Sequence, residues 1–82
     1  MEKRIAVLAI IINELESSEK VNSVLHEYSD IIIGRMGIPY RERGVSVISV
    51  VVDADTDTIS ALTGKLGKIS GVSVKAAVSK SK

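Results

Sequence analysis

The feature that most constrains the fold is an unbroken apolar run, IAVLAIII, at residues 5–12. A run of this length without helical periodicity is typical of a strand that is buried on both faces. The segment VSVISVVVD at 45–53 is almost as apolar. The run at 5–12 is far too short to cross a bilayer, and no small-residue cleavage site follows it, so we expect a cytoplasmic protein with no membrane partner.

Composition narrows the class of protein further. The 82 residues suffice for a single domain, 1–82, and 45% of them are hydrophobic, which favours a folded chain. Phe, Trp and Cys are absent. The lack of cysteine excludes disulfides, thiolate zinc sites and iron–sulfur ligation. A net charge of +1 gives no general attraction to nucleic acid, so we expect no direct nucleic-acid binding.

The order of the predicted elements is β-α-β-β-α-β. In the first helix, Val21, Val24, Leu25 and Tyr28 lie at helical spacing, and Ser17 or Ser18 is suited to the N-cap. This order in an α+β chain matches the ferredoxin-like plan, a four-stranded antiparallel sheet with two helices on one face and the first and third strands central. The expected strands are 5–12, 30–38, 45–53 and 72–79, and the expected helices are 18–29 and about 55–69.

Two helices cover only one face of such a sheet, yet both central strands are apolar on both faces. In the first strand, Ile5, Val7 and Ile11 alternate with residues of the opposite face. A monomer would therefore expose an apolar patch of several hundred Å², which soluble monomers seldom tolerate. We predict a homo-oligomer, a dimer or tetramer, that covers the open sheet face or joins sheet edges.

The segment 34–44, GRMGIPYRERG, is the main candidate for a binding loop. Arg35, Arg41 and Arg43 offer planar bidentate donors for carboxylate or phosphate. Gly34 and Gly37 would let backbone amides approach an anion. Lys65 and Lys68, on the second helix, could add positive charge. The alternative is a solvated turn whose charges keep an edge strand soluble. Neither the phosphate-loop nor the dinucleotide-binding glycine pattern is present.

The only histidine, His26, follows Asn22 by one helical turn beside the apolar stripe of the first helix. It could reach a ligand or a metal, or it could be a boundary residue that hydrogen-bonds locally. A metal site needs three or four ligands, and a single histidine without cysteine is a poor start, so we predict no metal and no cofactor.

Other functions common on this fold lack their residues. The strands carry no aromatic pair for stacking on RNA, and no base is evident for nucleophilic catalysis, so we predict no catalytic residue and no enzyme activity. The acidic run DADTDT at 53–58 lacks the glycine and glutamate of a calcium loop, and capping of the second helix by Asp55 or Asp57 explains it more simply.

Three blocks of sequence, LHEY, IIIGRMGIPYR and ISALTGKLG, resemble a small family of regulators associated with the iron-only hydrogenase system. The resemblance covers nearly the whole chain. It implies a stand-alone ACT-like domain, oligomeric and similar to the C-terminal regulatory domain of the nickel-responsive repressor. The repressor's sensing domain uses several histidines and a cysteine, and it has a separate DNA reader. This chain has His26 alone and no such reader, so a regulator of this kind would act through a partner.

ACT domains commonly bind amino acids at subunit interfaces, so the resemblance implies a regulatory domain that senses a small molecule there. The ligand-binding candidates are Arg35, Tyr40 and Arg41, followed by Asn22 and His26. The rival expectation is an assembly or adaptor protein that holds protein partners and binds no small molecule.

Overall fold

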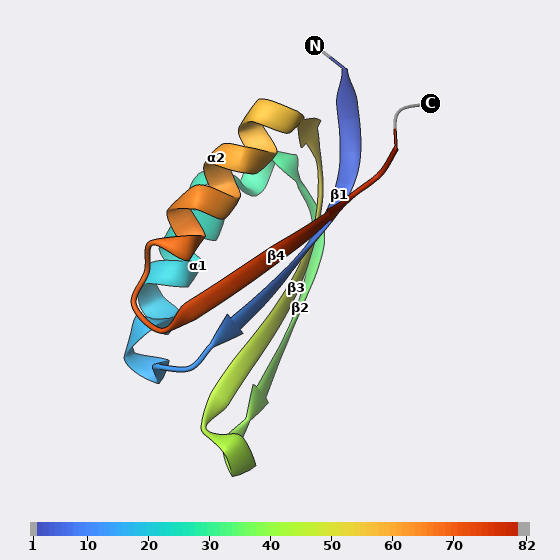
Figure 1. Cartoon of the computed structure of the whole chain (residues 1–82). Helices are drawn as coiled ribbons and strands as arrows, with labels where there is room; N and C mark the ends of the chain where they lie inside the picture. The colour runs from blue at the N-terminus through green and yellow to red at the C-terminus, as the bar shows by residue number, and fades with distance from the viewer. Residues whose placement is uncertain (1, 81–82) are drawn as a thin grey trace.

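The chain forms a four-stranded antiparallel sheet with both helices packed on one face (Figure 1). A computed structural model describes residues 2–80. No helix within those residues is long and apolar enough to cross a membrane. The elements are β1 (Lys3–Ile12), α1 (Ser18–Glu27), β2 (Ile32–Tyr40), β3 (Val45–Asp55), α2 (Thr56–Gly67) and β4 (Val72–Val78), with short 3-10 turns at Leu15–Ser17, Ser29–Ile31 and Arg41–Arg43.

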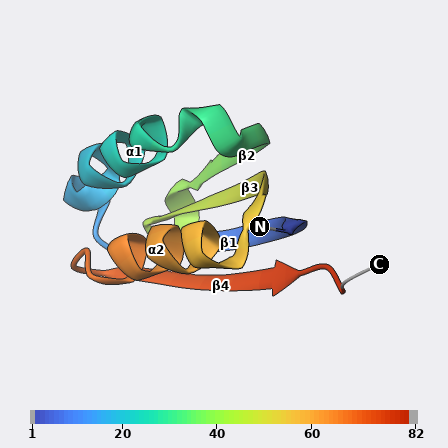
Figure 2. The ribbon, with the colours of Figure 1, turned by 90° about the horizontal axis from the view of Figure 1, so that it is seen from above.

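The strand order is β2-β3-β1-β4, so the first and third strands are central as predicted. Every neighbouring pair is antiparallel. Seen from above in Figure 2, α1 lies over the β2 side of the sheet and α2 over the β1 and β4 side. This is the ferredoxin-like, ACT-like fold that the element order predicts.

The two faces of β1 differ sharply in exposure. Leu8, Ile10 and Ile12 point towards the helices and are fully buried, whereas Val7 on the other face is 40% exposed. The same alternation runs along β3, where Ile48, Val50, Val52 and Ala54 are buried. We call the uncovered side of the sheet the open face. It consists of Ile5, Val7, Ala9 and Ile11 of β1 together with the residues of β2, β3 and β4 that lie opposite them.

Helix α2 begins as predicted, because the Asp55 side chain accepts a hydrogen bond of 2.8 Å from the backbone N–H of Thr58. Helix α1 begins differently. Ser17 occupies its N-cap, but the Ser17 hydroxyl makes no capping bond and instead donates to the Ser70 carbonyl oxygen at 2.7 Å. The Ser17 side chain therefore makes a tertiary hydrogen bond in place of the local capping bond that the sequence predicts.

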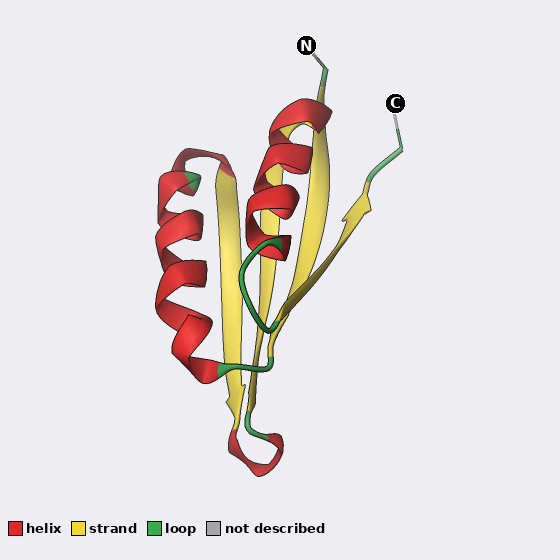
Figure 3. Cartoon of the chain, turned by 60° about the vertical axis from the view of Figure 1, so that its left-hand side comes forward, coloured by secondary structure: helices red, strands yellow, loops and turns green. Residues whose placement is uncertain are grey.

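The strand expected at 30–38 is confirmed, but the binding loop expected at 34–44, which overlaps it, is wrong for most of its length. Strand β2 continues to Tyr40, and only the 3-10 turn Arg41–Arg43 and Gly44 connect it to β3. Pro39 is compatible with this assignment because β2 is an edge strand. Gly44 has a positive φ of 66°, which closes the turn. Figure 3 shows this β2–β3 hairpin extending beyond the helices.

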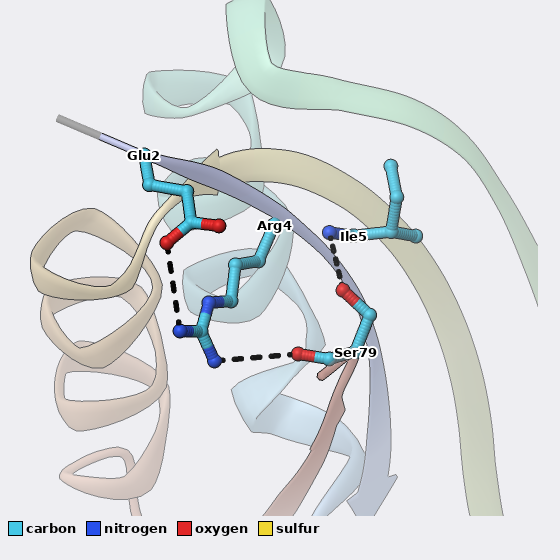
Figure 4. A network of polar contacts seen from close by, with 4 residues as sticks. All are labelled: Glu2, Arg4, Ile5 and Ser79. Atoms are coloured by element: carbon cyan, nitrogen blue, oxygen red, sulfur yellow. Dashed lines mark hydrogen bonds and ion pairs between the residues drawn. The ribbon is translucent and has the colours of Figure 1, made fainter. Parts of the chain in front are cut away.

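The far end of β4 is fastened to β1 by polar contacts (Figure 4). The Ser79 hydroxyl accepts a bond from the Ile5 N–H at 3.1 Å, and the Ser79 N–H donates to the Ile5 carbonyl oxygen at 2.8 Å. Arg4 donates to the Ser79 carbonyl oxygen at 3.4 Å and pairs with Glu2 at 3.7 Å. These contacts hold β4 alongside β1 just past its last ladder residue, Val78.

Candidate functional site

The candidate site is a polar pair at the β2 edge of the molecule. A guanidinium nitrogen of Arg35, on β2, donates a hydrogen bond to the amide oxygen of Asn22 on α1. The Asn22 amide nitrogen donates in turn to the Ser18 carbonyl oxygen at 3.0 Å, which fixes the direction of the amide. Two residues that the sequence proposed separately are thus brought together, with a helix and a strand each supplying one.

A β-bulge decides which way Arg35 points. Ile32 lies opposite Val52, but Gly34 lies opposite Val51, so Ile33 is the extra residue. Simple alternation would put Ile32 and Arg35 on opposite faces of the sheet. With the bulge both lie on the helix side, where Arg35 reaches α1, and Met36, Ile38 and Tyr40 turn to the open face.

His26 lies one helical turn beyond Asn22, so it faces the same edge of the molecule. Its side chain is exposed and makes no hydrogen bond with any residue in the range 2–80. The local hydrogen bond expected for His26 as a boundary residue is therefore absent among the described residues. In the part of the chain that the structure describes, no group of three His, Cys, Asp or Glu side chains is placed to hold a metal ion.

Tyr40 and Arg41 lie elsewhere. Tyr40 is opposite Val45 at the end of the hairpin, on the open face, and 47% of it is exposed. Arg41 begins the 3-10 turn that follows. The five candidates consequently form no single cluster: Asn22, His26 and Arg35 share the β2 edge, and Tyr40 and Arg41 share the hairpin end.

Gly34 and Gly37 do not shape an anion-binding loop. Both belong to the extended strand β2, and neither has a positive φ. An added Cβ would meet nothing within 4 Å at Gly34 and only the Ile48 side chain at 4.0 Å at Gly37. Neither glycine is therefore needed to let the backbone come close to another group of the chain.

The positive charge of Lys65 is also placed elsewhere. Its ammonium lies 3.3 Å from Glu27 and 5.5 Å from the ring centre of Tyr28, between the two helices. The hydrogen bond to Glu27, supported by the attraction of that carboxylate, raises the pKa of Lys65. By contrast, no carboxylate among residues 2–80 forms an ion pair with Arg35. The cation at the β2 edge is held in place by a neutral amide and keeps its charge uncompensated.

A groove on the helix side was not apparent from the sequence. It encloses about 550 Å³ and is lined by Glu19, Lys20, Ser23, Val24 and Ile69. Four of these residues are on α1, whereas Ile69 follows the end of α2, so only the packing of the two helices creates it. Its two charged residues, Glu19 and Lys20, have opposite signs, so the lining indicates no particular class of ligand.

The strand order and the two helices on one face define the class of this protein as a ferredoxin-like, ACT-like α+β domain. The chain belongs to the TM1266-like family, described as "Iron-only hydrogenase system regulator, putative", which it matches over residues 4–76. The resemblance noted in the sequence is thereby confirmed, and the family supports a regulatory role. None of the curated proteins compared with the chain matches it.

The solved structures that are similar to this chain include the following two. The structure of the uncharacterized protein TM1266 from Thermotoga maritima has 44% sequence identity and a TM-score of 0.92, and the match covers 96% of this chain and 100% of that one. A formyltetrahydrofolate deformylase from Pseudomonas putida KT2440 has 14% identity and a TM-score of 0.64, covering 89% of this chain and 28% of the enzyme. The second match concerns the fold alone.

Proposed function

We propose that this protein is a non-catalytic regulatory domain of an iron-only hydrogenase system, that it works as a homo-oligomer, and that it senses a small anion at the β2 edge. The ligand class is a carboxylate or phosphate compound, with an amino acid as the first candidate. Arg35 binds the anion, Asn22 positions Arg35, and His26 contributes a further donor. Binding shifts the balance between two states of the assembly, because the ligand has a higher affinity for one of them.

The observation that carries this proposal is the state of Arg35. The guanidinium is directed by Asn22 and leaves further N–H donors for a bidentate contact with a carboxylate or phosphate. An arginine whose position is fixed before binding loses less side-chain entropy when the ligand arrives. An edge strand is also where a second subunit can approach, so a site at this edge can report on assembly.

The second candidate function is that of an adaptor that holds a partner protein and binds no small molecule. The open face favours it, because Ile5, Val7, Ile11, Met36 and Ile38 are each at least 40% exposed. Exposed apolar patches of this kind mark interaction surfaces. On this alternative, Arg35 would serve only the solubility of the edge strand.

The experiment that separates the two functions is thermal unfolding of the protein with a panel of amino acids, nucleotides, inorganic phosphate and divalent metals. A ligand that binds only the folded state, at 100 times its dissociation constant, adds about 2.7 kcal/mol to the free energy of unfolding. We expect one class of anion to do so, and Arg35→Ala to abolish the effect. Arg43→Ala is the matched control, since it removes one exposed arginine from the hairpin turn instead.

If no compound of the panel changes the free energy of unfolding, the sensing function is contradicted and the adaptor function remains. An anion whose effect is lost equally in Arg35→Ala and Arg43→Ala would show that overall charge, not the β2 edge, is responsible. Arg41→Ala tests the hairpin end in the same way, and a selective loss there would move the site from Asn22 and Arg35 to Tyr40 and Arg41.

A further inference from the structure

Four aligned rows of side chains cross the open face, and the strand register fixes their membership. Residues directly opposite each other in neighbouring antiparallel strands point to the same face. The rows, read from β2 or β3 towards β4, are Ile38, Val47, Ile11 and Ser73; Met36, Ser49, Ala9 and Lys75; Gly34, Val51, Val7 and Ala77; and Asp53 with Ile5.

Most side chains in these rows are apolar, with two serines, Ser49 and Ser73, and two charged residues, Lys75 and Asp53. Lys75 ends the second row on β4, and Asp53 begins the fourth row on β3. Neither residue forms an ion pair with any other residue in the range 2–80. The other two charges on this side, Lys3 and Asp55, lie opposite each other at the far end of the strands, and Asp55 already caps α2.

Lys75 and Asp53 are placed symmetrically about Val7. Val7 pairs with Ala77 on one side and with Val51 on the other. Lys75 is two residues before Ala77, and Asp53 is two residues after Val51. Each charge is therefore one strand and one row away from Val7, in opposite directions. A two-fold axis that passes beside Val7, in the plane between two stacked sheets, exchanges the two positions.

We infer that the open face is covered by a second copy of this chain, packed face to face about a two-fold axis beside Val7, with Lys75 of each copy paired with Asp53 of the partner. This inference rests on the homo-oligomer of the proposed function and names the surface it uses. Each charge that the monomer leaves unpaired gains a partner of opposite sign. Valine and isoleucine side chains fill the space between the two ion pairs.

The geometry of this dimer follows from the sheet spacings. A displacement of two residues along a strand and one strand across, about 6.6 Å and 4.8 Å, makes the strands of the two copies cross at roughly 70°, near the orthogonal class of sheet packing. Four strands are about 19 Å wide, so two sheets that cross at roughly 70° overlap over about 400 Å² of flat contact from each copy. A total of about 800 Å² is below the range of standard stable interfaces, so the dimer is weak and its formation depends on protein concentration.

The test is a charge exchange measured by sedimentation equilibrium. Lys75→Glu places two carboxylates together at both ends of the interface, and Asp53→Lys places two ammonium groups there. We expect each single reversal to raise the dimer dissociation constant about tenfold or more, because two pairs are lost and repulsion replaces them. The double variant Lys75→Glu/Asp53→Lys restores both pairs and returns the constant to near that of the original protein.

Two further variants serve as controls. Lys20→Glu changes the net charge by the same amount as Lys75→Glu but lies on α1, on the helix side, and is expected to leave dimerisation unchanged. Val7→Lys puts a charge at the centre of the interface without touching the buried core and is expected to give a folded monomer. It provides the test if either reversal at 53 or 75 fails to fold by circular dichroism.

The outcomes distinguish this inference from the proposed function. Three results would overturn the open-face interface and leave oligomerisation through another surface. They are single reversals with no more effect on dimerisation than Lys20→Glu, a double variant whose dissociation constant is no closer to that of the original protein than those of the singles, and a dimer that persists in Val7→Lys. A monomer at every concentration would overturn both the interface and the oligomer of the proposed function. Neither result decides whether anion binding depends on Arg35, which the unfolding panel measures separately.

Discussion

The Ser17 hydroxyl and the Ser70 carbonyl oxygen, 53 residues apart in sequence, lie 2.7 Å apart and join the two helix-containing connections of the fold. Ser17 precedes α1 and Ser70 precedes β4. A second bond, from the Asn13 N–H to the Gly71 carbonyl oxygen at 2.7 Å, joins the same two segments. The two βαβ halves are therefore locked together at one end of the sheet by polar contacts as well as by their shared core.

Removal of the Ser17 hydroxyl should destabilise the domain. Ser17 is 5% exposed, and Ser17→Ala removes its donation to the Ser70 carbonyl oxygen, so we expect a loss of about 0.5–1.5 kcal/mol in the free energy of unfolding. Urea denaturation measures it. Ser23→Ala on the exposed side of α1 is the control and should change little. Equal values for the two variants would show that the Ser17–Ser70 bond contributes nothing net.

Gly71 should tolerate a side chain less well than Gly44, although both have a positive φ. Gly44→Ala meets no atom within 4 Å and should cost only the left-handed strain of about 1–2 kcal/mol. In Gly71→Ala the new Cβ would also lie 2.6 Å from the Glu14 side chain, which accepts a bond from the Ser70 hydroxyl. We expect a larger fall in melting temperature for Gly71→Ala, and a larger fall for Gly44→Ala would contradict the described packing.

The α2 cap should make stability depend on pH. The bond from the Thr58 N–H lowers the pKa of Asp55 below its ordinary value of 3.8. A carboxylate with a lowered pKa in the folded state stabilises above its unfolded pKa, and this contribution is lost as pH falls through the folded pKa. In Asp55→Asn, which keeps the acceptor but not the charge, unfolding followed from neutral to acidic pH should lack this component. A constant difference between the two proteins across that range would contradict the cap.

Lys65 should show the opposite dependence. Because Glu27 raises the pKa of Lys65, the contribution of this lysine is present below its unfolded pKa and is lost as pH rises through the folded pKa. The pair is well exposed, so its effect on stability should be small and weakened by salt. Lys65→Gln measured by urea unfolding at low and high salt tests this. A large loss that is insensitive to salt would point to packing on Tyr28 instead.

Much of the fold could be predicted because hydrophobic burial dominates it. The alternation of Val7 and Leu8 between two faces, and the continuous apolar character of β1, follow from the sequence once the strand order is known. The Asp55 cap could be predicted because it depends only on residues of the same helix end. Ser17 occupies the N-cap of α1 as predicted, but its hydroxyl makes no capping bond because it donates to a carbonyl 53 residues away, a contact that local sequence rules do not contain.

The candidate site was predicted less completely because it depends on tertiary geometry. Asn22 and His26 share a helix side by spacing alone, but the bulge at Ile33 determines that Arg35 joins them, and a bulge has no clear signal in IIIGRMG. Tyr40 and Arg41 were grouped with Arg35 because 34–44 was interpreted as a loop. In an extended strand five residues span about 16 Å, so Tyr40 lies well away from Arg35.

The most direct test of the account is a nuclear magnetic resonance titration that follows the Arg35 guanidinium and the Asn22 side-chain amide while amino acids or inorganic phosphate are added. The account predicts saturable chemical-shift changes at both groups with one class of anion. The same changes should persist in the control variant Arg43→Ala. Resonances at Arg35 and Asn22 that stay unchanged with every anion, in a protein that remains folded, would contradict sensing at the β2 edge.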